Sequence, residues 1–574
     1  MRTAARPQAA GAPRAALLAA VLMATLVALW HGWRTGVPEA IAEPGAERLE
    51  CVSYAPFRRP GETPFDPAAF VDEARIEADL RLIAPRSGCV RTYSVSQGLD
   101  AVPRVAQRLG MTVLLGAWLG RDRTENEAEL AAAIGVAREH AATVRAVVVG
   151  NEVMLRRELP EAELVAYIER VRREVPVPVT YADVWEFWLK HPSLAPAVTF
   201  VTIHILPYWE DEPVGIDAAI THVVEVWRAM RTALPGRDIL VGETGWPSEG
   251  RARRDAVPGR VEQARFVRQF SRAAAEHGIR YNLIEAFDQP WKRQLEGAMG
   301  GAWGLLDSEG RPKFDWHGPV APRDDWTAWR TAAGIGALLG ALAVGLAARG
   351  HRRGHGHGRA KPARAASART GALFGALAGP GLGVMLAEQA RYMVVWNRTP
   401  LEWLATSVAT LVVGAACIAS AALIARRLTG DDDGQVALPT AAATLSAWLR
   451  TGRDPPLAGW VALLHAGVLF AATLTVVLHA FDARYRGFDW ALFAPAAVAV
   501  ALLWAAGVSR SEGAVEERWL AWTLLAGAVV MGVSEGPANA QALGYGGLMA
   551  VLAGGALLRA STSTPSSRPI AEGS

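Results

Sequence analysis

Residues 144–152 read VRAVVVGNE, and residues 239–248 read ILVGETGWPS. Each stretch starts with a short aliphatic run and then presents a glutamate, Glu152 or Glu243. Short aliphatic runs of this kind are typical of the buried strands of a parallel sheet. The two stretches therefore predict two parallel strands, each of which carries a carboxylate at its carboxyl end.

Six further segments have the same character, and stretches of helical period such as 68–83, 126–140, 161–174 and 261–277 lie between them. Eight strand–helix units between residues 48 and 320 fit the usual size of a TIM barrel, about 250 residues. We predict an α/β fold here, a (β/α)8 TIM barrel. The eight expected strands are residues 51–54, 89–93, 112–118, 144–150, 177–182, 200–206, 239–243 and 281–287.

Apolar stretches long enough to cross a bilayer flank the barrel on both sides. Residues 15–30 read AALLAAVLMATLVALW and follow three arginines with no acid, so we predict a short cytoplasmic tail and an uncleaved anchor over residues 1–35. Residues 326–560 predict an all-α multi-helix transmembrane domain, followed by a cytoplasmic tail over 561–574. Its seven expected spans are 328–348, 371–395, 402–425, 457–480, 489–508, 518–534 and 541–559.

The basic residues predict the orientation of these spans. The loop between the first two C-terminal spans is rich in Lys, Arg and His and has no acid, so we expect it to face the cytoplasm. The N-terminus is then inside, the barrel is exported, and eight spans in all return the C-terminus to the inside.

Composition excludes some classes of function. The net charge of +3 gives no argument for nucleic-acid binding, and no Cys/His spacing resembles a zinc site. No GxxxxGK[ST] phosphate loop occurs, which argues against a nucleotide-sugar synthase. We therefore expect no metal, no cofactor and no nucleic-acid partner. Of the three cysteines, Cys417 lies in an apolar run, and we expect Cys51 and Cys89 on neighbouring strands as buried reduced thiols, with a disulfide as the alternative.

Paired carboxylates at the carboxyl ends of barrel strands suit the hydrolysis of glycosidic bonds. One carboxyl group, protonated, assists the leaving oxygen, and the other, ionised, attacks the anomeric carbon. Mutual repulsion and partial burial are expected to raise the pKa of the acid. Two structural ion pairs are the alternative interpretation of the same pattern.

Three motifs resemble one enzyme family. VGNE at 149–152, GETGWPS at 242–248 and EAFDQPWK at 285–292 are similar to glycoside hydrolase family 17, which acts on β-1,3-glucans, and the resemblance spans about residues 48–315. It implies a retaining barrel enzyme with Glu152 as general acid/base and Glu243 as nucleophile. It also implies that Asn151 bonds the sugar 2-hydroxyl. The chain departs from many plant members at Gln289, where a further glutamate is expected.

Other polar and aromatic residues near strand ends are candidates for substrate binding. We expect Arg91 either to bond the nucleophile carboxylate or to form a structural salt bridge, and His204 and Tyr208 to orient Glu243 or a sugar hydroxyl. Of six tryptophans near strand ends, 118, 185, 188, 209, 246 and 291, we expect the last two to stack on sugar. The full candidate set is Tyr54, Arg91, Tyr93, Asn151, Asp183, His204, Tyr208, Trp246, Glu285, Trp291 and Lys292.

A barrel followed by many apolar helices resembles bacterial membrane proteins described as β-(1→6) glucan synthases. The resemblance implies a bacterial inner-membrane protein with a periplasmic barrel that remodels β-glucan, and a glucan synthase as a further partner beside the glucan and the lipid bilayer. Transfer of the glycosyl-enzyme to a glucan acceptor is the favoured reaction. An endo-β-1,3-glucanase is one alternative, and a glucan-binding export or scaffold protein is the other. For that last alternative, Glu388 and Arg391 are an expected ion pair within one span.

Overall fold

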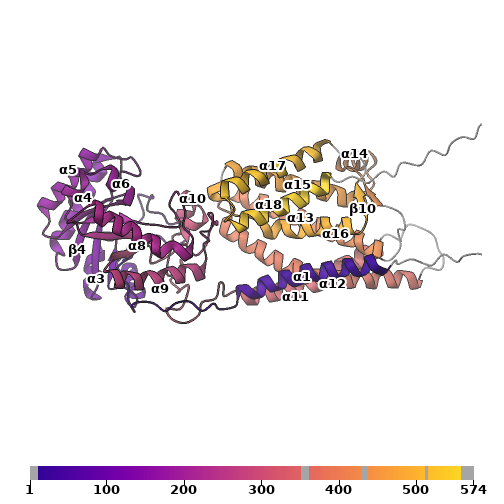
Figure 1. Ribbon diagram of the computed structural model, residues 1–574, viewed down its shortest axis with the longest axis horizontal. Coiled ribbons are helices and arrows are strands. Elements are labelled where there is room, and N and C mark those ends of the chain that lie inside the picture. Colours follow the sequence, from indigo (N-terminus) through magenta and orange to yellow (C-terminus); the bar gives the residue numbers. More distant parts are fainter. Residues whose placement is uncertain (1–10, 351–360, 429–435, 482, 511–514, 558–574) are drawn as a thin grey trace, which may run out of the picture. The chain divides into compact units, whose positions relative to one another are not determined.

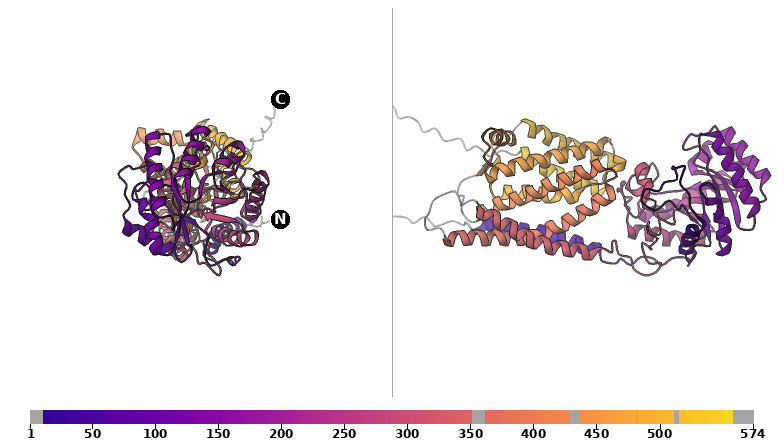
Figure 2. Two further views of the ribbon diagram at one scale, coloured as in Figure 1. Left: turned by 90° about the vertical axis from the view of Figure 1, so that its left-hand side faces the viewer. Right: turned by 180° about the vertical axis from the view of Figure 1, so that it is seen from behind.

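The computed structural model describes residues 11–350, 361–428, 436–481, 483–510 and 515–557. The chain divides into two compact units, drawn in Figures 1 and 2. The barrel unit comprises Val37–Asp324 with Arg484–Gly487, and the helical unit comprises Met1–Gly36, Asp325–Ala483 and Phe488–Ser574. The predicted tail 561–574 and part of the predicted basic loop, residues 351–360, lie outside the described residues.

The barrel unit contains a closed barrel of eight parallel strands in sequence order, with helices outside the strands (Figure 2). β1 pairs with β2 on one side and with β8 on the other, where Val52 lies opposite Leu283. All eight predicted strands are confirmed, each within a few residues of its expected bounds. The strands are β1 Val52–Ser53, β2 Cys89–Arg91, β3 Thr112–Ala117, β4 Val144–Asn151, β5 Val179–Val184, β6 Val201–His204, β7 Ile239–Thr244 and β8 Arg280–Leu283.

Helices cover the outside of the barrel, and local sequence explains where several begin and end. Asp72 accepts a hydrogen bond from the Arg75 amide at the start of α2, and Gly278 takes a positive φ of 66° at the end of α9. The helices are α2 Glu73–Ile83, α3 Val102–Arg108, α4 Arg123–Glu139, α5 Glu161–Glu174, α6 Trp185–Lys190, α7 Leu194–Ala197, α8 Ile216–Ala233, α9 Arg260–His277 and α10 Arg293–Glu296, with 3-10 turns η1 Leu99–Ala101, η2 Pro290–Lys292 and η3 Ala298–Gly301.

The amino-terminal end of the barrel interior is apolar and contains a disulfide. Cys51 and Cys89 are bonded to each other, and their Cα atoms lie 4.4 Å apart. Val52 pairs with Val90, so the residues just before them lie side by side on the same face of the sheet. The prediction of two reduced thiols is therefore wrong. The remaining residues of this buried cluster are Leu114, Ala146, Val148, Ala182, Phe200 and Leu240.

The helical unit contains nine described helices and one two-stranded parallel sheet. Its helices are α1 Gly11–Thr35, α11 Trp326–Gly350, α12 Lys361–Trp396, α13 Pro400–Leu428, α14 Ala441–Thr451, α15 Leu457–Phe481, α16 Trp490–Ala505, α17 Val515–Glu535 and α18 Ala540–Leu557, and its strands are β9 Val436–Leu438 and β10 Val508–Arg510. The short 3-10 helix η4, Ala483–Tyr485, follows α15.

Six helices of the described residues are long and apolar enough to cross a membrane. These segments are Ala16–Thr35, Trp326–Leu346, Gly371–Trp396, Pro400–Arg427, Leu457–Phe481 and Ala540–Leu557. The sequence predicted eight spans. The other two expected spans are helical, but α16 has only 16 residues and α17 begins with Glu516, Glu517 and Arg518 and ends at Glu535.

Glycines bring α11 and α12 into close contact. A Cβ atom added to Gly336 would lie 2.2 Å from the Gly379 carbonyl oxygen, and one added to Gly375 would lie 2.1 Å from that of Gly340. Any larger residue at these positions would force the two backbones apart. Small residues at four-residue spacing are typical of helix pairs inside membranes.

Candidate active site

Three strands of the barrel have a register shift close to their candidate site residues. The shifts lie between Val148 and Asn151 on β4, between Ile203 and His204 on β6, and between Val241 and Thr244 on β7. Gly150 and Glu152 also have positive φ angles of 83° and 55°. Irregularities of this kind redirect side chains, and here they turn Glu152, His204 and Glu243 toward one another.

His204 lies between the two predicted catalytic glutamates. Its Nδ1 is 2.8 Å from an oxygen of Glu152, and its Nε2 is 3.7 Å from an oxygen of Glu243. One oxygen of each carboxylate and a ring nitrogen of His204 all lie within 4.8 Å of one another. The structure thus brings the two glutamates together, as expected from their positions at strand ends.

Glu243 is held by two donors from β2 and the residues after it. The Tyr93 hydroxyl donates to Glu243 at 2.8 Å, and the buried Arg91 guanidinium contacts the same oxygen at 3.3 Å. Arg91 also donates to the side-chain oxygen of Asn151 at 2.5 Å and to the Gly242 carbonyl at 2.8 Å. One arginine therefore fixes β4 and β7 relative to each other and supplies positive charge beside the carboxylate.

The contacts of Glu152 determine its charge in this arrangement. Burial raises the pKa of Glu152, but the hydrogen bond and charge of His204, together with Arg156 and Arg91, outweigh it and lower that pKa below its ordinary value. The sequence led us to expect a raised pKa for the acid. That expectation did not include the imidazole of His204, 2.8 Å away. Burial and the charge of Glu243 raise the pKa of Tyr93 well above its ordinary value, so the phenol remains a donor.

A second charged pair lies at the end of β8. The Lys292 ammonium donates to both oxygens of Glu285 at 2.9 Å, and burial raises the pKa of Glu285 to about 7 against the opposing effect of Lys292. Beside this pair the Trp291 indole donates to Gln289 at 2.9 Å, and Gln289 donates to the Ala55 carbonyl at 2.7 Å. Gln289 therefore serves to hold the loop that carries Trp291.

Tyr54, Asp183, Tyr208 and Trp246 are buried predicted binding residues that form hydrogen bonds to other parts of the barrel. Trp246 is fully buried against Phe266 and donates to the Val257 carbonyl, and Tyr208 is 1% exposed and donates to the Arg251 carbonyl. The prediction that these side chains contact sugar or orient Glu243 does not fit this packing. Tyr54 and Asp183 are fully buried as well. The Tyr54 hydroxyl donates to Asp79, and Asp183 accepts from Tyr181 and from the Met154 amide, which fixes the loop after Glu152.

Comparison with known proteins identifies the chemistry of this unit. Residues 51–304 match the family model of the BtgE/BtgC glycoside hydrolase domain. The barrel is a glycoside hydrolase domain. The chain is 26% identical over 266 residues to a glucan 1,3-beta-glucosidase of Candida albicans, covering 42% of this chain and 86% of that protein. It is 27% identical over 232 residues to a glucan 1,3-beta-glucosidase of Schizosaccharomyces pombe, covering 38% and 72%.

Two solved structures are also similar to the glycoside hydrolase domain. One is the glycoside hydrolase family 17 beta-1,3-glucanosyltransferase from Rhizomucor miehei, with 23% identity, a TM-score of 0.41, and coverage of 46% of this chain and 95% of that chain. The other is an endo-laminarinase from Formosa, with 19% identity, a TM-score of 0.39, and coverage of 47% and 86%.

The structure adds a side chain of the glycoside hydrolase domain that the sequence analysis missed. Arg156 lies 4.2 Å above the ring of Trp118, donates to the Asn151 and Leu119 carbonyls, and pairs with Glu158 at 2.6 Å. The side chain of Trp118 is 37% exposed. A tryptophan at the end of the third strand was visible in the sequence, but nothing in the spacing connected it with Arg156.

The grouping of Glu152, His204 and Glu243 has the composition of a metal site. In the glycoside hydrolase domain Glu152 and His204 already bond each other, and the Arg91 guanidinium contacts Glu243 at 3.3 Å. A fixed cation beside the carboxylates opposes the binding of a second one. The absence of a metal cofactor stays a prediction from the sequence.

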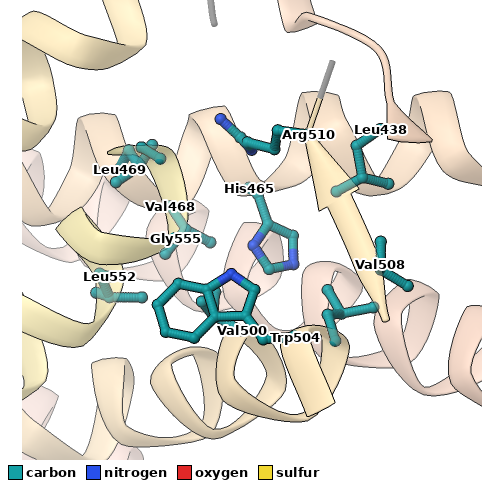
Figure 3. A pocket seen from close by; sticks show the side chains of 12 residues that line it. Leu438, His465, Val468, Leu469, Val500, Trp504, Val508, Arg510, Leu552 and Gly555 are labelled. Atoms are coloured by element: carbon teal, nitrogen blue, oxygen red, sulfur yellow. The ribbon is translucent and has the colours of Figure 1, made fainter. Parts of the chain in front are cut away.

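The helical unit has cavities of its own. One of about 30 Å³ lies among α15, α16, α18 and the two short strands, and Figure 3 shows His465, Arg510 and Trp504 on its walls. The His465 ring contacts the Ser420 hydroxyl at 2.8 Å. A space of this volume holds one or two waters and no sugar.

Proposed function

We propose that the protein is a retaining glycosidase of β-1,3-glucan that transfers the cleaved chain to a glucan acceptor, with Glu152 as general acid/base and Glu243 as nucleophile. The observation that carries the proposal is the approach of their carboxylate oxygens to within 4.8 Å. Carboxyl groups of retaining enzymes lie about 5–5.5 Å apart, whereas those of inverting enzymes lie about 6.5–9.5 Å apart to admit a water.

In the first step, an oxygen of ionised Glu243 attacks the anomeric carbon, and the bond from that carbon to the leaving oxygen breaks. The leaving oxygen takes its proton from Glu152. Arg91 and Tyr93 hold the Glu243 carboxylate in place, and the Tyr93 phenol can release its hydrogen bond as the negative charge on Glu243 is consumed.

The second step reverses the roles. Glu152, now a carboxylate, takes the proton of an acceptor hydroxyl, and the acceptor oxygen attacks the anomeric carbon and frees Glu243. The acceptor is a glucan hydroxyl in transfer and water in hydrolysis. His204 supports this change of role because it contacts Glu152 directly. The contact adjusts the affinity of Glu152 for a proton in both steps.

The substrate class rests on the relatives. The two curated relatives are named as glucan 1,3-beta-glucosidases, and one similar structure is named as a beta-1,3-glucanosyltransferase. The partly exposed rings of Trp118 and Trp291 suit the stacking of pyranose rings. We infer that Asn151 and Lys292 bind sugar hydroxyls beside them, and that the buried Glu285 holds Lys292 in place.

Two features support a location at a bacterial inner membrane with the barrel on the periplasmic side. Six helices could span a membrane, and the disulfide between Cys51 and Cys89 suits an oxidising compartment. The partners proposed are β-glucan, the bilayer and a glucan synthase that supplies the chain.

The test incubates the full-length protein in detergent with β-1,3-gluco-oligosaccharides and follows product length by mass spectrometry and linkage by NMR. Products longer than the substrate are expected for transfer, with β-1,3 or β-1,6 bonds. Products that are only shorter would establish an endo-glucanase instead. No turnover by the folded wild type would overturn the catalytic proposal and favour a glucan-binding or export protein.

Azide separates the roles of the two glutamates. With an activated β-glucoside, Glu152→Gly should yield the β-glycosyl azide, because azide replaces the acceptor after the glycosyl-enzyme has formed. Glu243→Gly should yield the α-glycosyl azide, because azide then attacks in place of the nucleophile. The opposite pairing of variants and products would show that the two roles are exchanged.

A further inference from the structure

A large cavity lies within the helical unit and plays no part in the glycosidase chemistry. It has a volume of about 570 Å³ and is lined by α1, α12, α13, α16 and α18. α1 lies alongside α12 in Figure 1 and contacts it closely. Volumes of about 300–1,000 Å³ with mostly apolar walls are typical of ligand sites.

The cavity has a closed end and an open end. Phe374, Ile424 and Leu502 line the closed end and are 1%, 1% and 9% exposed. Trp30, His31, Trp490 and Gln541 line the other end, which is the end at which α1 stops and α11 begins. The rings of His31 and Trp490 meet edge to face there, with centroids 4.7 Å apart.

The depth of the cavity matches half a bilayer. Trp490 and Leu502 are twelve residues apart on α16, which corresponds to about 18 Å at 1.5 Å per residue. The hydrocarbon core of a membrane is about 30 Å thick, so one leaflet is about 15 Å deep. Tryptophan is enriched at the boundary between hydrocarbon and headgroups, which is where Trp30 and Trp490 would then lie.

The walls are mostly apolar, and Tyr545 adds one buried hydroxyl to them. The Thr25 hydroxyl lines the cavity but donates to the Leu377 carbonyl at 2.7 Å, and the Ser420 hydroxyl donates to the Ala416 carbonyl at 2.7 Å. A buried water needs two to four polar partners, so an apolar occupant suits this space better. Val27 and Val498 also line the cavity and are 57% and 37% exposed, which leaves it a side open to the surrounding hydrocarbon.

We propose that this cavity binds one hydrocarbon chain of a bilayer phospholipid. The hydrocarbon chain enters from the open side, and its methyl end reaches Phe374, Ile424 and Leu502. The headgroup of the phospholipid stays beside Trp30, His31 and Gln541. The bound hydrocarbon chain then packs against α1, α12, α13, α16 and α18 and becomes part of the folded helical unit. The proposal does not depend on the reaction of the glycosidase domain.

A photoreactive phospholipid tests the proposal. The full-length protein is placed in phosphatidylcholine nanodiscs that contain a phosphatidylcholine with a diazirine at the end of one acyl chain, then irradiated and mapped by peptide mass spectrometry. We expect adducts on Phe374, Ile424 and Leu502, which bulk lipid cannot reach because they are buried. Adducts confined to outward-facing residues such as Leu411, which is 73% exposed, would overturn the proposal.

Two variants and a matched control sharpen the result. Ala378→Phe on α12 and Ala421→Phe on α13 each place a ring in the cavity and should abolish the closed-end adducts, while labelling of Leu411 persists. Ala405→Phe adds the same ring to an exposed position of α13 and should leave the closed-end adducts unchanged. Closed-end labelling that survives in both cavity variants would refute the site. Monodisperse elution and unchanged turnover of a soluble glucoside report whether each variant is folded.

Discussion

The two ends of the barrel interior are built from the same eight strands and have opposite chemistry. At the amino-terminal end, the Cys51–Cys89 disulfide lies among aliphatic side chains and one phenylalanine. At the carboxyl end, Arg91, His204 and the two glutamates form one network of hydrogen bonds and charges. The first end stabilises the closed barrel, and the second end depends on that closure because its residues come from four different strands.

The largest effect expected is at the carboxyl end. Glu152→Gln and Glu243→Gln should each reduce glucan turnover by about 10⁴-fold or more, because general acid/base catalysis alone contributes about 10²–10⁴ and the acid and nucleophile act as a unit. Steady-state rates with a β-1,3-gluco-oligosaccharide give the size of the loss. Thermal unfolding should stay close to that of the wild type, and a large drop in unfolding temperature would mean that this end also stabilises the fold.

The amino-terminal end should show the reverse. Cys51→Ala/Cys89→Ala removes a crosslink over a sequence separation of 38 residues, which is expected to cost about 4 kcal/mol of unfolding free energy. Denaturant unfolding of the barrel measures the loss. Glucan turnover at low temperature should be nearly unchanged, since the disulfide touches no residue of the glutamate network. A variant of normal stability with reduced turnover would contradict this division between the two ends.

A smaller effect is expected from His204, which connects the two glutamates. His204→Gln removes the charge that lowers the pKa of Glu152 while burial, which raises it, remains. The general acid must be protonated, so turnover falls as the pH rises through its pKa, and in the variant this fall should move to higher pH. The profile of kcat/KM against pH measures the shift, and kcat should drop by up to about 10²-fold through misplacement of the pair.

Tyr208→Phe is the control for that measurement, because the Tyr208 hydroxyl donates to the Arg251 carbonyl. It should leave the pH profile in place. If kcat/KM of His204→Gln falls at the same high pH as in the wild type, the imidazole does not set the proton affinity of Glu152.

The smallest effect concerns the aromatic rim of the carboxyl end. Trp291→Ala should raise KM by about tenfold at most, because one aromatic contact contributes about 0.5–1.5 kcal/mol. Trp246→Phe, in the buried layer behind the site, should lower thermal stability and leave KM unchanged. A rise in KM for Trp246→Phe with Trp291→Ala unaffected would reverse the assignment of these two rings.

The fold and the central pair could be predicted from sequence for a simple reason. Buried parallel strands are read from uninterrupted aliphatic runs, and a residue that follows such a run lies at the carboxyl end of its strand. That is enough to place Glu152 and Glu243 together. It does not give side-chain direction after the strand has ended, and Trp246 and Tyr208 turn outward into the layer beneath the helices.

Three further features depend on distances that no spacing reveals. The disulfide requires Cys51 and Cys89 to lie side by side at matching register, the lowered pKa of Glu152 requires His204 at 2.8 Å, and Arg156 reaches Trp118 from a different strand end. The number of spans stays a prediction, because two of the eight expected spans are not among the six long apolar helices. α16 is shorter than a bilayer requires, and the charged ends of α17 shorten its apolar stretch.

Glu152 has a left-handed backbone, with a φ of 55°. For a residue with a Cβ atom this conformation costs about 1 kcal/mol, and glycine or asparagine occupies it with less strain. Replacement of Glu152 by either residue therefore destroys the acid and relaxes the chain in a single change. The relaxation is offset by the loss of the hydrogen bond between Glu152 and the buried His204.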